Sequence, residues 1–345
     1  MSTEKLYRIE YLGKVLETTH FADISDAKCD EIRQAFWKKP NIEAVHKNLA
    51  SIRRGGTQVS TITEYYVKDL MSNTKLYSPR WTITEVFECN DLIRYFYSRI
   101  QASETVYPKT KSEIENIETA LRISGGGVAM KPSNFPMQTV DSVLNRYNLN
   151  NRYYDFSCGW GVRLLSALKN KCAYFGTDPN HELVARLRQI HQDYDLVNST
   201  QSTVDIRATG SEIYHADWTN TMGVAFSSPP YFTLEDYKIG EQSIKGRDYQ
   251  AWLREYLAPT IENIKKYLIP GGHVIINIKN FGEYRLYDDT FSLCESAALT
   301  YVETLELDNI TRPSAKDDIN TDEKIMVFRN GKKSKPSPMD LFVFD

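Results

Sequence analysis

A short segment near the middle of the chain could hold a planar amine in place. Residues 227–232 read Ser-Ser-Pro-Pro-Tyr-Phe and follow an apolar Val-Ala-Phe run. Because prolines cannot donate to a sheet ladder, the strand must end there and main-chain carbonyls stay free. The Ser228 hydroxyl oxygen and the Pro229 carbonyl could then accept both hydrogens of an exocyclic NH2 and direct its lone pair at an electrophile. Tyr231, with Phe232 behind it, offers a flat face for a planar base that carries the amine. The alternative interpretation of the same residues is a proline-rich turn with aromatic packing.

A glycine turn earlier in the chain could bring a ligand close to the backbone. Residues 155–161 read Asp-Phe-Ser-Cys-Gly-Trp-Gly and lie between a strand expected at 153–156 and a helix expected at 162–169. Glycines allow close approach at the carboxyl edge of an α/β sheet, and a helix N-terminus favours a carboxylate or a phosphate. An ordinary tight turn between a strand and a helix is the alternative.

Two acids follow the glycine turn at positions suited to a nucleoside. Asp178 follows the strand expected at 173–177, about 20 residues after the turn, where one carboxylate can accept both hydroxyls of a ribose. It could also cap the helix expected at 181–192, and the two roles are compatible. Asp217, in His-Ala-Asp-Trp, is a candidate acceptor for the exocyclic amine of an adenine, or else a residue of a surface turn.

These segments belong to a pattern in which strands and helices alternate after residue 128. Such alternation predicts an α/β fold, with a mainly parallel sheet and helices on both faces. Apart from the strands named above, the expected elements are strands at 224–227 and 273–278, a helix at 249–268, and an antiparallel closing hairpin at 301–307 and 324–328.

The first 123 residues read differently. Helices are expected at 26–36, 41–52 and 111–122, whereas 66–70 and 81–87 could be strand or helix. The run Ser-Gly-Gly-Gly from residue 124 marks a boundary. We therefore expect a helix-rich N-terminal region at 1–123, an α/β domain at 128–330 and a tail at 331–345, close to the two domains that 345 residues favour.

The motifs together resemble the class I S-adenosylmethionine-dependent methyltransferases, specifically the branch that methylates amino groups of DNA bases. The resemblance covers about residues 130–330. It rests on the glycine turn, Asp178, Asp217, the catalytic Ser228-Pro229-Pro230-Tyr231, Pro270-Gly271-Gly272 and the last strand at 323–329. It implies a Rossmann-like methyltransferase sheet and bound S-adenosylmethionine. The cofactor-binding residues that it implies are Asp155, Ser157, Gly159, Gly161, Asp178, Asp217, Trp218 and Phe135.

The resemblance also implies a substrate. Only 73 positions separate Asp155 from Ser228, which leaves no room for a target-recognition insert, so the N-terminal region is expected to recognise double-stranded DNA with a flipped base. A serine at the first motif position favours cytosine N4 over adenine N6, and both stay open. A methyltransferase for RNA bases or protein amides, or an inactive DNA-binding relative, are the alternatives. A cognate restriction nuclease would be a partner of the DNA enzyme.

A basic stretch at 47–80 fits a nucleic-acid partner. The stretch contains six basic and two acidic residues, a local net charge of +4, and tyrosines and Trp81 lie among or next to them in the sequence. Arg53 and Arg54 lie in a glycine-containing turn with donors suited to phosphates. Arg247 adds a second basic position after the proline motif. We expect these arginines and Phe232 to bind substrate, against the alternative of a solvated face with core aromatics.

The net charge, the lengths of the apolar runs and the cysteine spacing exclude several classes of protein. A net charge of −3 rules out a uniformly basic surface but not a local basic face. The N-terminus has no apolar core of a secretory signal, and the apolar runs are too short to span a bilayer. Five cysteines without CxxC spacing predict neither a disulfide framework nor a metal site. We expect a cytoplasmic protein of bacterial or phage type with no membrane partner.

Overall fold

The computed structural model describes residues 5–76, 80–101, 116–117, 120, 128–130, 132–238, 242–280, 282–306 and 324–331. The chain forms two compact units, and it passes between them more than once. Unit 1 comprises Met1–Val45, Ser60–Asn134 and Thr233–Ile239, and unit 2 comprises His46–Val59, Phe135–Phe232 and Gly240–Asp345. The predicted boundaries at 1–123 and 128–330 differ from this division at three places: residues 46–59 belong to unit 2, and residues 128–134 and 233–239 belong to unit 1.

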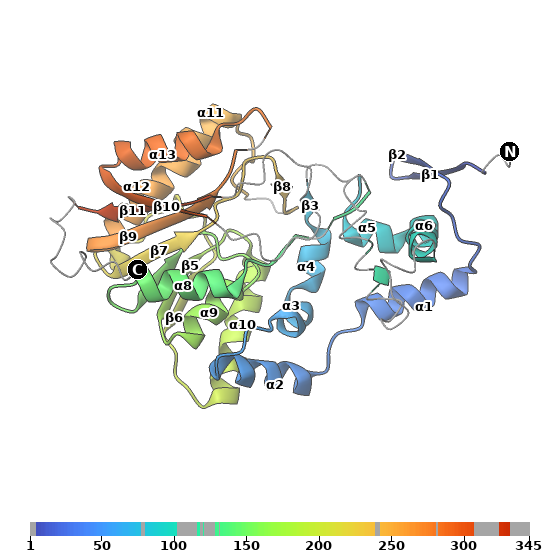
Figure 1. Ribbon diagram of the computed structural model, residues 1–345, viewed down its shortest axis with the longest axis horizontal. Coiled ribbons are helices and arrows are strands. Elements are labelled where there is room, and N and C mark those ends of the chain that lie inside the picture. Colours follow the sequence, from blue (N-terminus) through green and yellow to red (C-terminus); the bar gives the residue numbers. More distant parts are fainter. Residues whose placement is uncertain are drawn as a thin grey trace, which may run out of the picture. The chain divides into compact units, whose positions relative to one another are not determined.

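Unit 2 contains a seven-stranded sheet (Figure 1). Its strands are β4 (Arg152–Asp155), β5 (Ala173–Thr177), β6 (Val204–Arg207), β7 (Met222–Ser227), β9 (Leu268–Ile278), β10 (Leu299–Glu306) and β11 (Lys324–Asn330). The order across the sheet is β10-β11-β9-β7-β4-β5-β6. The strands from β6 to β9 are parallel, and β11 pairs antiparallel with both β9 and β10. The predicted fold class, a mostly parallel sheet with an antiparallel closing hairpin, is confirmed.

Helices cover both faces of this sheet. In Figure 1, α8, α9 and α10 lie on one side of it and α11, α12 and α13 on the other. Their bounds are α8 (Met137–Tyr147), α9 (Val162–Lys169), α10 (His181–Asn198), α11 (Tyr249–Trp252), α12 (Ala258–Tyr267) and α13 (Leu286–Ser296). Every residue of β7 is buried, as expected for a central strand with helices on both faces.

The helix predicted at 249–268 differs in two respects. It is interrupted by a π-helical turn, Leu253–Leu257, just before Pro259 in the first turn of α12. Because proline has no N–H to continue the α-helical ladder, a wider turn absorbs the missing hydrogen bond. The helix also ends at Tyr267, and β9 begins at Leu268, so the Pro-Gly-Gly sequence lies within that strand and not in a turn before it.

Unit 1 is built from short helices and small sheets. Its elements are β1 (Tyr7–Tyr11), β2 (Lys14–Thr18), α1 (Asp26–Trp37), α3 (Ser60–Tyr66), α4 (Lys68–Asn73), β3 (Lys75–Leu76), α5 (Ile83–Glu88), α6 (Asn90–Gln101) and β8 (Glu235–Asp236), while α2 (Ile42–Arg53) runs from unit 1 into unit 2. The two ambiguous segments, 66–70 and 81–87, are largely helical. The helix predicted at 111–122 and the boundary at 124–127 lie mostly outside the described residues.

Candidate functional site

The glycine turn is held in shape by a buried ion pair. Asp155, the last residue of β4, is fully buried, and its Oδ2 accepts hydrogen bonds from Arg163 Nε and from the Tyr174 hydroxyl, each at 2.9 Å. The Ser157 N–H donates to Oδ1 over 3.3 Å, and Arg163 Nη2 donates to the Ser157 carbonyl. Burial and the charge of Asp155 raise the pKa of Tyr174, which keeps its hydroxyl a donor. The Asp155 carboxylate is therefore bound by groups of the protein itself, and these hydrogen bonds fix the conformation of the turn.

Both glycines of the turn have left-handed backbone conformations. Gly159 has φ +58°, and Gly161, which precedes α9, has φ +91°. A Cβ at Gly161 would lie 3.1 Å from Leu187 Cδ2 and 3.3 Å from Ile190 Cδ1 of α10, and one at Gly159 would lie 3.1 Å from Arg163 Nη2. Glycine adopts these conformations without strain and lets α9 pack closely on α10.

Asp178 follows β5 and lies beside the glycine turn. Its Oδ1 accepts from the Asn180 N–H at 3.0 Å, and the Gly159 N–H also donates to its carboxylate. Asn180, not Asp178, caps α10, because its side chain accepts from the Leu183 N–H at 3.1 Å. Burial, and to a smaller extent the charge of Asp155, raises the pKa of Asp178 to about 7 in spite of the two donors. A buried carboxylate at a sheet edge with spare acceptor capacity suits a ligand diol.

Asp178 should make the folded state lose stability as the pH rises. Its pKa is about 7 in the folded protein against an ordinary value of 3.8, so the folded state holds an extra proton between these two values. The free energy of unfolding should therefore fall across this window, by up to about 4 kcal/mol relative to Asp178→Asn. Urea unfolding in steps of pH checks this, with the exposed Asp23→Asn as control. A difference between wild type and Asp178→Asn that does not change with pH would contradict it.

The proline motif contacts the glycine turn directly. Ser227, the last residue of β7, donates from Oγ to the Ser157 carbonyl at 3.1 Å. Asn277, near the end of β9, donates from Nδ2 to Ser228 Oγ at 2.9 Å and to the Tyr231 hydroxyl at 3.2 Å. The Tyr231 hydroxyl donates to the Asn277 carbonyl at 3.2 Å. Tyr231 as a whole is only 7% exposed, so a base can stack on its ring only if neighbouring atoms move.

Two predicted aromatic residues lie close to these motifs. Phe232 has φ +50° and packs in an aromatic cluster with Tyr249, Trp252 and Tyr284, with ring centroids 4.9–5.9 Å from its own. Phe135 packs edge-on against Phe226 of β7 at 5.5 Å, and Arg163 Cζ lies 6.0 Å from its ring. Phe232 thus supports the proline motif from behind, and Phe135 lies next to the glycine turn.

Asp217 and Trp218 both pack against side chains of β6. They lie in a 3-10 turn, Ala216–Trp218, shortly before β7 begins, and Asp217 is bound by both terminal nitrogens of Arg207, at 3.0 and 2.5 Å. That hydrogen bonding lowers the pKa of Asp217. Trp218 is buried beneath the Arg207 guanidinium, whose Cζ is 4.2 Å from its ring, and donates to Asp205 at 3.0 Å. Both residues therefore already have structural partners on β6, Arg207 for Asp217 and both Arg207 and Asp205 for Trp218.

Glu212 is an acid at the site that the sequence reasoning missed. It follows β6 at the carboxyl edge of the sheet, in a loop whose Ser211 and Glu212 carbonyls accept from Asn263 Nδ2 at 3.1 and 2.9 Å. Glu212 Oε2 is buried without a hydrogen-bond partner among the described residues. After burial itself, Glu212 and Asp178 both raise the pKa of the buried Tyr256, so the two acids lie near one ring. The signal in the sequence was Gly-Ser-Glu directly after a strand that had not been predicted.

The predicted basic stretch is divided by the fold. Arg53 and Arg54 lie at the C-terminus of α2, where Gly55 has φ +101° and the Gly56 N–H donates to the Ser51 carbonyl at 2.9 Å. The turn is thus a helix C-cap, and basic side chains there complement the negative end of the helix dipole. Among the other members, Lys68 is buried 4.0 Å from the Phe36 ring, and Tyr66 and Trp81 are core residues, as the alternative interpretation expected.

Arg247 also has partners within unit 2. Its Nη1 donates to the Ser243 carbonyl at 2.7 Å, and its Nε lies 3.4 Å from Glu255 Oε2. These contacts fix the segment before α11, and part of the side chain stays exposed, at 23%. A phosphate at this position would compete with Glu255 for the guanidinium.

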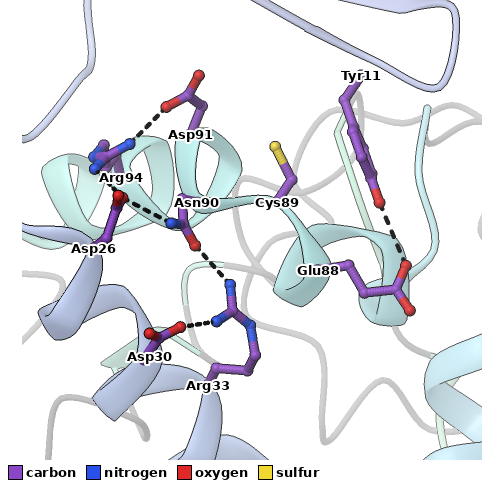
Figure 2. A pocket seen from close by; sticks show the side chains of 9 residues that line it. All are labelled: Tyr11, Asp26, Asp30, Arg33, Glu88, Cys89, Asn90, Asp91 and Arg94. Atoms are coloured by element: carbon purple, nitrogen blue, oxygen red, sulfur yellow. Dashed lines mark hydrogen bonds and ion pairs between the residues drawn. The ribbon is translucent and has the colours of Figure 1, made fainter.

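Unit 1 has a shallow polar hollow between α1, α5 and α6, shown in Figure 2. Four carboxylates and two arginines line it: Asp26, Asp30, Glu88, Asp91, Arg33 and Arg94. Arg94 bridges Asp26 and Asp91 at 2.7 and 2.8 Å, and Asn90 Nδ2 donates to Asp26 at 2.7 Å. The arginines are engaged and the formal charge is negative, so this face of unit 1 does not suit a phosphate backbone.

Comparisons with known proteins give only distant likenesses. No known protein family and no curated protein matches the sequence. Among solved structures, the N-methyltransferase NodS from Bradyrhizobium japonicum WM9 in complex with S-adenosyl-l-homocysteine is 14% identical, with a TM-score of 0.39 over 58% of this chain and 90% of that one. A geranyl diphosphate methyltransferase in complex with GPP and sinefungin is 9% identical, with a TM-score of 0.40 over 56% of this chain and 76% of that one. A TehB-like SAM-dependent methyltransferase from Corynebacterium glutamicum is 15% identical, with a TM-score of 0.36 over 56% and 86%.

In the part of the chain that the structure describes, no group of three or more His, Cys, Asp or Glu side chains could hold a metal ion. Across the same residues, none of the helices is long and apolar enough to cross a membrane.

Proposed function

We propose that the protein is an S-adenosylmethionine-dependent methyltransferase that acts on the exocyclic amine of a nucleobase in DNA. One observation carries the proposal: the hydrogen bond from Ser227 to Ser157, at 3.1 Å, joins the proline motif to the glycine turn at one edge of the sheet. A cofactor held by the glycine turn and an amine held by Ser228 would therefore be neighbours. The fold supports the proposal, because open α/β sheets bind ligands at this edge.

The residues at this edge fit the cofactor. The left-handed Gly159 and Gly161 allow close approach at the start of α9, whose N-terminus favours a carboxylate. Asp178 can accept the ribose hydroxyls. For the adenine amine, Glu212 is a candidate beside Asp217, because Glu212 Oε2 has no hydrogen-bond partner among the described residues whereas Arg207 already binds Asp217. The cofactor would supply an electrophilic methyl group.

The protein's part in the reaction is to position the amine. Ser228 Oγ accepts one hydrogen bond from Asn277 and has a second lone pair for one amine hydrogen. The Pro229 carbonyl can accept the other, so the nitrogen lone pair would point away from the ring. No nucleophilic side chain is required, since orientation and polarisation suffice for a direct transfer, in which the nitrogen would form a bond to the methyl carbon as the bond from that carbon to sulfur breaks, and would then lose one hydrogen as a proton to water. Serine at the first position favours cytosine N4 over adenine N6.

Transfer of labelled methyl groups from S-adenosylmethionine tests the substrate class. The protein is incubated separately with duplex DNA, RNA and a protein fraction, and the proposal predicts label in the DNA. Label in RNA or protein alone would assign the site to one of those substrates instead. Salt-dependent DNA binding without cofactor binding would identify an inactive relative. Under this proposal the protein acts in the cytoplasm, and a cognate nuclease would cut the same target sequence.

A further inference from the structure

Asn277 is a polar residue in an otherwise apolar strand. It lies in β9 within Val-Ile-Ile-Asn-Ile, is 2% exposed, and pairs across the sheet with Ile325 of β11. Its Oδ1 is buried without a hydrogen-bond partner among the described residues. An unsatisfied buried amide oxygen costs stability, and an apolar residue would avoid that cost. A role for the Nδ2 amino group would account for the presence of an asparagine at this position.

The Nδ2 amino group of Asn277 contacts both the first and the last residue of the Ser228–Tyr231 motif. Asn277 Nδ2 donates to Ser228 Oγ at 2.9 Å and to the Tyr231 hydroxyl at 3.2 Å, and the same hydroxyl donates to the Asn277 carbonyl at 3.2 Å. The two prolines between Ser228 and Tyr231 have no N–H with which to fix the turn through main-chain donors. Three hydrogen bonds from one buried residue therefore hold the hydroxyls at the first and last positions of the motif.

We propose that Asn277 is the positioning residue of the Ser228–Tyr231 turn, setting the amine acceptor and the aromatic ring as one unit. The inference rests on the proposed function and deepens it. By donating to one lone pair of Ser228 Oγ, the amide fixes where the remaining lone pair meets the substrate amine. By holding the Tyr231 hydroxyl at two points, it sets the plane of the ring relative to that acceptor.

Hydrogen exchange tests the positioning without any need for activity. Asn277→Ala removes both side-chain donations and keeps the main-chain carbonyl. The Tyr231 and Phe232 amides should then exchange at least about tenfold faster than in the wild type. The matched control is Asn330→Ala, because Asn330 Nδ2 donates to the Leu268 carbonyl at 2.9 Å and takes no part in the site. Exchange at residues 231–232 that is equal in Asn277→Ala and Asn330→Ala would overturn the inference.

The pH profile of Asn277→Asp tests the direction of the hydrogen bond. A protonated carboxyl can donate to Ser228 Oγ, as Nδ2 does, whereas a carboxylate cannot. The quantity to compare is the ratio of the kcat of Asn277→Asp to that of wild type at each pH, because Asp178 titrates in both proteins and cancels. This ratio should approach one at low pH. It should fall by up to about tenfold per pH unit above the carboxyl pKa, to the level of Asn277→Ala. The KM for the cofactor should stay within about twofold of wild type, since the residue acts through Ser228. A ratio of kcat values that is flat with pH would contradict the assignment.

The two tests separate this inference from the proposed function. If the wild type transfers no methyl group to any nucleobase, the proposed function fails, and hydrogen exchange alone then decides whether Asn277 positions the turn. If the wild type is active and Asn277→Ala has wild-type kcat, only the role of Asn277 is rejected.

Discussion

Tyr231→Ala is expected to lower kcat for methyl transfer by about 5- to 150-fold and to change cofactor affinity by less than about twofold. Base stacking on an aromatic side chain contributes about 1–3 kcal/mol, which corresponds to a rate effect of about 5- to 150-fold if it is made in the transition state. The substitution also removes the hydroxyl that Asn277 holds at both of its 3.2 Å contacts. Cofactor affinity is measured by calorimetry and kcat by label transfer.

Tyr231→Phe separates the two contributions. It keeps the ring and removes only the hydroxyl, so its kcat should lie between those of wild type and Tyr231→Ala. If Tyr231→Ala kept the wild-type kcat, the ring would have no part in holding the base. A loss of cofactor binding as large as the loss of rate would place Tyr231 at the cofactor instead.

Arg163→Met is expected to destabilise the folded protein by about 3–5 kcal/mol, the usual effect of breaking a buried pair. Asp155 is fully buried and Arg163 has 8% of its side chain exposed, so neither group can be solvated in place. Without the guanidinium, the Asp155 carboxylate keeps neutral donors such as the Tyr174 hydroxyl and the Ser157 N–H but loses its positive partner. The free energy of unfolding in urea is the measurement.

The double variant Asp155→Asn with Arg163→Met serves as the control for this ion pair. Because it removes the uncompensated negative charge together with its partner, it should recover a large part of the lost stability. If Arg163→Met alone were as stable as wild type, the ion pair would not hold the glycine turn in shape. If the double variant were no more stable than Arg163→Met, the lost packing of the arginine would explain the effect.

The sequence predicted those parts of the fold that local constraints determine. The glycine turn and the double proline leave few conformations to the backbone, so α9 and β5 have the predicted bounds, and β7 ends where expected, at Ser227. The structure adds a contact between the two motifs, the hydrogen bond from Ser227 to the Ser157 carbonyl.

Side-chain partners from distant segments could not be predicted in the same way. Asn277 acts on Ser228 across 49 positions, an interval that no local pattern encodes, although a lone asparagine in an apolar strand was a visible signal. Asp217 matched a motif position, yet Arg207 of β6 binds it, a partner ten residues away that no motif indicated. The stretch at 47–80 had the charge expected of a nucleic-acid surface. Part of that charge instead completes the end of α2 or packs on an aromatic ring, as Lys68 does.

Mass spectrometry of nucleosides tests the central claim most directly. DNA of varied sequence is incubated with the protein and S-adenosylmethionine, digested and analysed alongside DNA treated with Ser228→Ala. The proposed function predicts N4-methylcytosine or N6-methyladenine with the wild type, and a loss of at least about tenfold in Ser228→Ala at unchanged cofactor affinity, since the acceptor for one amine hydrogen is gone. The claim would be contradicted if neither methylated nucleoside were found although the protein binds the cofactor. It would also be contradicted if wild type and Ser228→Ala produced equal amounts of the methylated nucleoside.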